Sequence, residues 1–178
     1  MRRLDLVPDC GKCAAVCCVA TSFDASDDFA FDKSAGVPCR HLRSDCRCAI
    51  HDDLARRGFR GCAVYDCYGA GQRVTQAFAE GSGDLGDRDE AFRILRGVHE
   101  LLWMLTEAAK LCPPSHPDLG RELAGAIDGL DAIARQPTPA IFEVDLRPQN
   151  DAVHALLRRV GDALGGKRGT NRALTVVQ

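Results

Sequence analysis

The chain has 178 residues, of which 46% are hydrophobic and 27% charged, and a formal net charge of −2. This composition is that of an ordinary globular protein with one domain, or one domain and an appendage. The charge does not predict a nucleic-acid binder, which usually carries a strongly basic face. No run approaches the roughly 18 apolar residues of a membrane helix, and no apolar run follows Arg2 and Arg3 as a secretory signal requires. We therefore expect a cytoplasmic protein that binds neither nucleic acid nor a membrane.

The cysteines gather in the first third of the chain. Nine of the ten lie between Cys10 and Cys67, and only Cys112 lies beyond them. Apolar runs in this region are short, turn residues are frequent, and sustained alternation of apolar and polar residues is missing. We therefore expect little sheet and only short helices, at 11–20 and 49–57. Residues 1–76 are called the cysteine module, and Gly69-Ala70-Gly71 near its end is interpreted as a helix-entry turn.

Residues 77–165 are predicted to form a helical domain. Residues 81–87, GSGDLGD, are interpreted as a flexible joint. A first helix is expected from Asp87 to Cys112, where Pro113 and Pro114 end it. Its predicted inward face recurs at 3-4 spacing: Leu95, Val98, Leu102, Leu105 and Ala109.

A second helix is expected to open near Pro117 and to form an antiparallel hairpin with the first, because the break between them is short. Its inward face is predicted to contain Leu119, Leu123, Ile127, Leu130 and Ile133. Residues 140–146, AIFEVDL, are expected to be extended, and a third helix is expected over 149–164. Its predicted inward residues are Val153, Leu157, Val160 and Leu164.

These patterns predict a mainly α fold: an irregular, metal-stapled cysteine module, then a helical hairpin and a third helix. Residues 166–178 are predicted to be a disordered tail. His99 and His154 fall within predicted helices, and we expect them to point to solvent or to cap a neighbour.

The cysteine spacing indicates metal binding. Cys10 and Cys13 form a CxxC turn, which brings two thiolates within reach of one ion, and a second pair completes a tetrahedral Zn²⁺ site. Four cysteines also hold iron–sulfur clusters. In a reducing cytoplasm such patterns more often indicate metal binding or catalysis than disulfides. The other interpretations are disulfides formed on oxidation, buried cysteines acting as small hydrophobes, and a thioredoxin-like pair, for which the required preceding strand is not evident.

Charge supports a bound cation. The module contains eleven Lys and Arg residues against ten Asp and Glu residues, so it is close to neutral. Clustered thiolates would repel one another unless a metal ion neutralised them. The adjacent pair Cys17-Cys18 adds a constraint, because neighbouring side chains diverge on a helix or a strand. Either each serves one of two sites, or both serve one cluster through an irregular turn.

These motifs resemble the YkgJ-like CxxCxxCC cysteine-cluster family, which is described as chelating zinc or iron. The segments CGKCAAVCCVA, FAFDKSAGVPCRHL, CAIHDDLARRGFRGCAVYDCYGAGQRVTQ and HELLWMLTEA look more closely like the N-terminal region of actinobacterial pentapeptide-repeat proteins. The closer resemblance covers residues 9 to about 135. The broad family has two residues where this chain has three between Cys13 and Cys17, and no A(D/N)Lxx repeats occur in the chain.

The resemblance implies a set of metal ligands. The matching cysteines are Cys10, Cys13, Cys17, Cys18, Cys39, Cys48, Cys62 and Cys67. Cys46 and Cys112 have no counterpart and are interpreted as bystanders, and His51 and His41 are weaker ligand candidates.

The predicted function is that of a metal-binding cysteine-cluster protein. Zn²⁺ is expected in one or two cysteine-rich sites with a structural or interaction role, and the helical hairpin is the expected surface for a protein partner. The alternative is an iron–sulfur protein with a redox or enzymatic role. The sequence offers many soft ligands and no evident general base, which favours the first interpretation.

Overall fold

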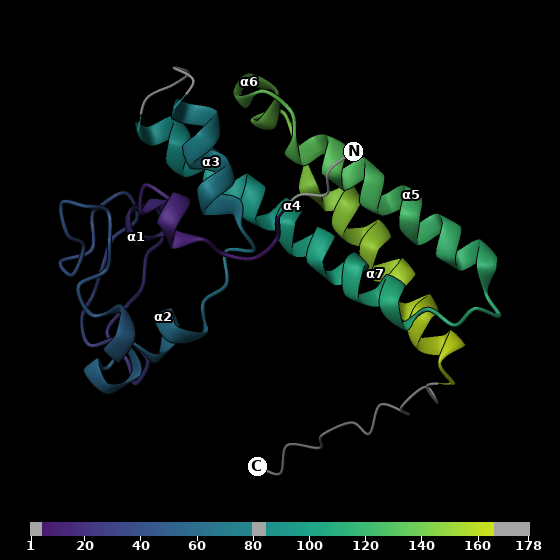
Figure 1. Ribbon diagram of the computed structural model, residues 1–178, viewed down its shortest axis with the longest axis horizontal. Coiled ribbons are helices and arrows are strands. Elements are labelled where there is room, and N and C mark those ends of the chain that lie inside the picture. Colours follow the sequence, from purple (N-terminus) through teal and green to yellow (C-terminus); the bar gives the residue numbers. More distant parts are fainter. Residues whose placement is uncertain (1–4, 80–84, 166–178) are drawn as a thin grey trace, which may run out of the picture.

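The computed structural model describes residues 5–79 and 85–165, and over these residues the chain is mainly helical (Figure 1). Strand-like pairing in the described residues is limited to isolated antiparallel bridges, among them the one between Phe23 and Lys33. The mainly α prediction is therefore confirmed, as is the expectation of little sheet. Within the same residues, no helix is both long enough and apolar enough to cross a membrane.

The predicted hairpin is formed by α4 (Leu85–Leu111) and α5 (Pro117–Ala134), and α7 (Leu146–Ala163) packs against both. Helix α4 also contacts α1 and α3 of the cysteine module, so it runs through both halves of the molecule (Figure 1). Residues 85–87, predicted to belong to a joint, already form the first turn of α4, whereas 81–84 lie outside the described residues. The predicted tail at 166–178 also lies outside them.

The helical faces follow the predicted spacing with shifts at their ends. Leu95, Val98, Leu102 and Leu105 are buried, but Ala108 is buried in place of Ala109, which is exposed. The turn of an α-helix, 3.6 residues, does not match a strict seven-residue repeat, so the inward face drifts around α4. On α7, Leu156 is buried and Leu157 is half-buried. The prediction for Leu164 is wrong, because α7 ends at Ala163 and Leu164 is exposed.

The inward face of α5 agrees with the prediction. Leu119, Leu123, Ile127 and Leu130 are buried, while Ile133 is half-buried and Ala134 is buried.

The extended segment expected at 140–146 is not formed. Instead α6 (Thr138–Ile141) makes one helical turn, with Pro139 in its first turn, where the missing N–H costs no hydrogen bond. Ile141 then enters the core at 1% exposure.

The cysteine module consists of short elements. They are the 3-10 turns η1 (Cys10–Lys12), η2 (His51–Asp53) and η3 (Ala55–Arg57), and the helices α1 (Val16–Ala20), α2 (Arg60–Val64) and α3 (Ala70–Ala79). The helix expected at 11–20 is interrupted because Ala15 adopts a left-handed conformation, with φ of 56°. The helix expected at 49–57 is two 3-10 turns. The helix-entry turn at Gly69 is confirmed, and α3 runs across residue 76.

Aromatic rings give the loops of the module a small core of their own. Phe23 stacks on Phe29 with ring centroids 4.3 Å apart, and Phe59 meets both Phe31 and His41 edge to face. The guanidinium of Arg40 lies 3.6 Å from the centre of the Phe31 ring. These rings lie outside the main hydrophobic core, which joins α1 and α3 to helices α4 to α7.

His99 is fully buried on α4, so the prediction that it faces solvent is wrong, whereas His154 is exposed as predicted. The Nδ1 atom of His99 lies 2.7 Å from the Tyr68 carbonyl oxygen. A carbonyl only accepts, so Nδ1 carries the proton and donates it. Nε2 is buried and has no hydrogen-bond partner within the described residues. Burial lowers the pKa of His99, and this histidine ties the Cys67–Gly69 turn to α4.

The burial of His99 predicts a loss of stability in mild acid. Below the ordinary pKa of 6.5 the unfolded chain takes up a proton that the folded His99 resists, so the free energy of unfolding falls as pH falls through this region. In His99→Asn the side-chain amide can still donate to the Tyr68 carbonyl but does not titrate. Urea unfolding of both proteins between pH 7.5 and 5.5, values chosen to bracket the ordinary histidine pKa by about one unit, should show a shallower pH slope for the variant. Equal slopes would contradict this role, and His154→Asn is the exposed control.

Candidate metal centre

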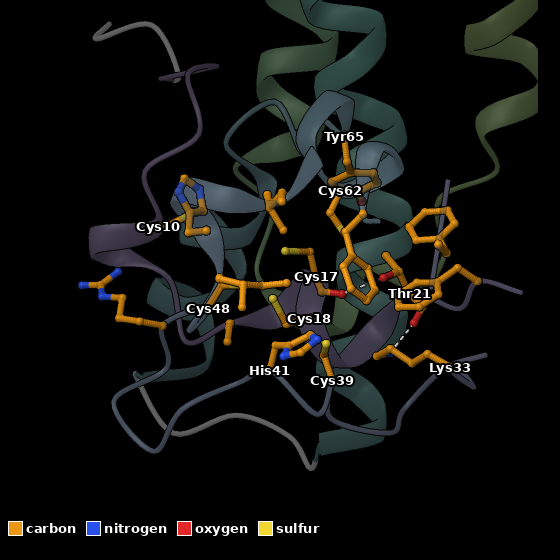
Figure 2. A pocket seen from close by; sticks show the side chains of 18 of the residues that line it. Cys10, Cys17, Cys18, Thr21, Lys33, Cys39, His41, Cys48, Cys62 and Tyr65 are labelled. Carbon is orange, nitrogen blue, oxygen red and sulfur yellow. Dashed lines mark hydrogen bonds between the residues drawn. The ribbon is translucent and has the colours of Figure 1, made fainter. Parts of the chain in front are cut away.

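The cysteine side chains of the module surround one cavity of about 460 Å³ (Figure 2). Seven of the eight predicted ligands line it, together with Cys46. The seven are Cys10, Cys13, Cys17, Cys18, Cys39, Cys48 and Cys62. Figure 2 shows Cys17, Cys18 and Cys39 directed toward the middle of the view. All ten cysteines carry free thiols, so no disulfide links them.

The eighth predicted ligand, Cys67, precedes α3 and is not among the residues that line the cavity. A Cβ atom placed on Gly71 would lie 2.8 Å from the Cys13 sulfur and 3.9 Å from the Cys67 sulfur. Two sulfurs from distant parts of the sequence therefore lie near the same residue. Contacts below about 3.0 Å are essentially never made by real Cβ atoms, so the Cys13 thiol occupies space that glycine leaves open.

Helix α3 positions the first cysteines by hydrogen bonds from its side chains. The buried Gln72 amide accepts from the backbone N–H of Asp9 and donates to the Val7 carbonyl. The Thr75 hydroxyl accepts from the backbone N–H of Ala14 over 2.9 Å. Because residues 7–14 lack regular structure of their own apart from η1, these bonds fix the CxxC turn against α3.

Backbone contacts hold a second group of cysteines. The N–H of Cys39 donates to the Cys18 carbonyl over 3.0 Å, which ties the loop that contains Cys39 to α1. Leu42 and Cys48 form an isolated antiparallel bridge that brings Cys48 back beside this loop. Cys62 reaches the cavity from α2, where Phe29 packs on Gly61 so closely that a methyl group there would overlap the ring.

The adjacent thiols of Cys17 and Cys18 are electrostatically unequal. A hydrogen bond from Cys17 lowers the pKa of Cys18 to about 7, helped by the positive charge of Lys33 and opposed by burial. The same hydrogen bond, with burial, raises the pKa of Cys17 well above its ordinary value. Cys18 is therefore the thiol that ionises most readily, and Cys17 acts as its donor.

Burial raises the pKa of four further lining thiols. It is the main cause for Cys10, Cys13 and Cys48, and it raises the pKa of Cys62 to about 11. Neighbouring cysteines add to the effect, since each negative charge disfavours the next. Without a cation most of these thiols stay protonated, and a bound metal ion would be needed to remove their protons.

Lys33 places a positive charge beside the thiols. Its side chain is buried, with a residue exposure of 7%, and its Nζ donates to the carbonyl oxygens of Val19 (2.9 Å), Ser34 (3.2 Å) and Thr21. Its closest electrostatic interactions are with Cys39 and Cys18. A buried ammonium is costly unless paired and hydrogen-bonded, and here three carbonyls and neighbouring sulfurs meet that need.

The thiols surround the cavity without meeting at one point. In residues 5–79 and 85–165, no group of three or more Cys, His, Asp or Glu side chains is arranged as a set of metal ligands. The weaker candidates His41 and His51 also line the cavity, where His41 packs between aromatic rings. Cys46 lines it too, although sequence analysis placed it apart from the ligands. Cys112 lies after the end of α4, away from the cavity.

The comparisons with known proteins give one relative. The chain is 45% identical, over an alignment of 123 residues that covers 65% of the chain, to a protein of Bacillus subtilis strain 168 named uncharacterized protein YybG. The match covers 44% of that relative, so the chain spans less than half the length of the curated protein it resembles. No family model matches the chain. No solved structure matches it either.

The Lys33 network yields a prediction about stability. Lys33→Met keeps the length of the side chain but leaves the Val19, Thr21 and Ser34 carbonyls without their ammonium donor. The Val19 and Ser34 carbonyls still accept from the backbone N–H groups of Gly36 and Val37, so the main loss is at the Thr21 carbonyl. A polar group left unpaired costs about 1–3 kcal/mol, and we expect a loss of that size in the free energy of unfolding. Urea unfolding followed by near-UV circular dichroism measures it. The control is Lys110→Met, because Lys110 is exposed and its ion pair with Glu107 contributes little. Equal losses in the two variants would show that the network does not stabilise the module.

Proposed function

We propose that the cysteine cavity binds Zn²⁺ and that the ion has a structural or interaction role. The observation that carries the proposal is the gathering of seven predicted ligand cysteines around one cavity, with the eighth against Cys13 and Gly71. These cysteines come from five separate segments of the chain. Thiolate sulfur is the donor that zinc prefers in structural sites.

The surroundings of the thiols support this proposal. Lys33 and Arg47 bring positive charge to the cavity, which partly balances the negative charge that several thiolates create around one divalent ion. Gly71 leaves room for sulfur at the wall. Bound Zn²⁺ would hold the cysteines as thiolates, and the thiols, which stand around the cavity, would turn inward on binding.

A structural role agrees with the way the module is built. Its elements are turns and helices of a few residues joined by isolated bridges, and its separate apolar core is a small group of aromatic rings. Small folds of this kind usually need a cross-link or a metal to reach useful stability. The proposed partner surface on the helical hairpin stays a prediction, as does the cytoplasmic location.

Metal content is the direct test. Protein purified without oxygen should be colourless and contain zinc in stoichiometric amounts by elemental analysis. A coloured, iron-containing protein would instead support the iron–sulfur alternative, in which the same cysteines hold a cluster. Protein that gains neither metal when refolded with each would contradict metal binding altogether.

Cys48→Ser tests the link between metal and fold. We expect this variant to lose zinc and to become sensitive to protease within residues 1–76, while residues 88–135 keep their helical circular dichroism signal. The matched control is Cys112→Ser, because Cys112 lies away from the cavity and should leave the zinc content unchanged. If a chelator leaves the near-UV signal and the cleavage pattern of the wild-type protein unaltered, the structural role is wrong.

A further inference from the structure

We infer that the eight cysteines form two separate four-sulfur metal sites, a refinement that rests on the proposed function. The inner set is Cys10, Cys13, Cys17 and Cys67. The outer set is Cys18, Cys39, Cys48 and Cys62. The two sets meet at the Cys17-Cys18 peptide, and each would take one divalent ion with a preference for sulfur.

The inner set lies against the helical core. Cys13, Cys17 and Cys67 pack against the main hydrophobic cluster, whereas none of the outer cysteines does so. The sulfurs of Cys13 and Cys67 both approach Gly71, and the CxxC turn joins Cys10 to Cys13 through a hydrogen bond from the Cys13 N–H to the Cys10 carbonyl.

The outer set lies among the loops and the aromatic rings. Cys39 is hydrogen-bonded through its backbone to Cys18, and the Leu42–Cys48 bridge returns Cys48 to the same loop. Cys62 enters from α2 and lines the same cavity as Cys18, Cys39 and Cys48. Helix α1, the two loop positions and α2 thus supply the four sulfurs of the outer set.

The adjacent pair explains why two sets form. Residues i and i+1 of an α-helix point about 100° apart. On α1 the buried side is set by Val16 and Ala20, which lie in the main core. Cys17 packs against that core, and the backbone carbonyl of Cys18 accepts from the N–H of Cys39. The two thiols are hydrogen-bonded to each other in this structure, and in the proposed sites each would instead bind the ion of its own set.

Each set also has its own cation. Arg47 donates to the Gly11 carbonyl inside the CxxC turn. Lys33 donates to the carbonyls of Val19 and Thr21, which follow Cys18 in the chain. Four thiolates around one divalent ion leave a net charge of −2, which a neighbouring cation offsets in part. The two positive charges thus stand where two such sites would need them.

Native mass spectrometry of the zinc-loaded full chain tests the division. We expect two zinc ions in the wild-type protein, one in Cys10→Ser, one in Cys62→Ser and none in the double variant. Cys112→Ser is the control and should keep both. A wild-type chain with one ion, or the loss of both ions from either single variant, would overturn the two-site division in favour of one shared site. A wild-type chain with no zinc would overturn the proposed function itself.

Gly71→Ala provides a second test that leaves every thiol in place. Its methyl group would enter the space of the Cys13 sulfur. We therefore expect a chelator to remove the ion of the inner set faster from this variant than from the wild type. The matched control is Gly120→Ala on α5, where a methyl group meets nothing within 4 Å. Far-UV circular dichroism checks that both variants keep their helices. Equal retention of both ions in the two variants would overturn the inner set.

Discussion

The docking of residues 7–20 on α3 is the contact on which the rest of the cysteine module depends. This segment has one 3-10 turn and one short helix, so its position is set by Gln72 and Thr75 and by the burial of Val16 and Ala20. Once it is in place, four cysteines face the cavity and Gly71 leaves room for the sulfur of Cys13. The helical core can form first, from apolar contacts alone, and then present the surface on which the thiols are arranged.

Charge is the second constraint on the module. Buried thiols resist ionisation, and every thiolate makes the next one harder to form. The fold counters this with Lys33, whose ammonium group is held by three backbone carbonyls, and with the hydrogen bond between Cys17 and Cys18. These two interactions stabilise negative charge at one or two sulfurs. They do not suffice for eight thiolates, so the proposed bound cation would be needed to ionise the whole set.

Sequence periodicity predicted the helical half well. The 3-4 spacing of large apolar residues located α4, α5 and α7, because burial of one helical face is a local pattern that tertiary structure preserves. Two features were missed because the decisive contact is distant in sequence. The burial of His99 depends on the Tyr68 carbonyl, and the aromatic core depends on Phe59 meeting rings some thirty residues earlier. The resemblance named eight candidate ligands, but neither it nor the spacing could show that Cys46 lines the cavity and that Cys67 does not.

Helix α4 has a consequence for where the protein can be divided. Its 27 residues extend for about 40 Å at 1.5 Å per residue, and one end packs on α1 and α3 while the rest packs on α5 and α7 (Figure 1). The same continuous core contains Val16, Val74, Phe92 and Leu123. A fragment that begins after residue 76 would therefore expose the α4 surface that α1 and α3 cover. The cysteine region and the helices thus share one interior, and a cut between them passes through that interior and not through a linker.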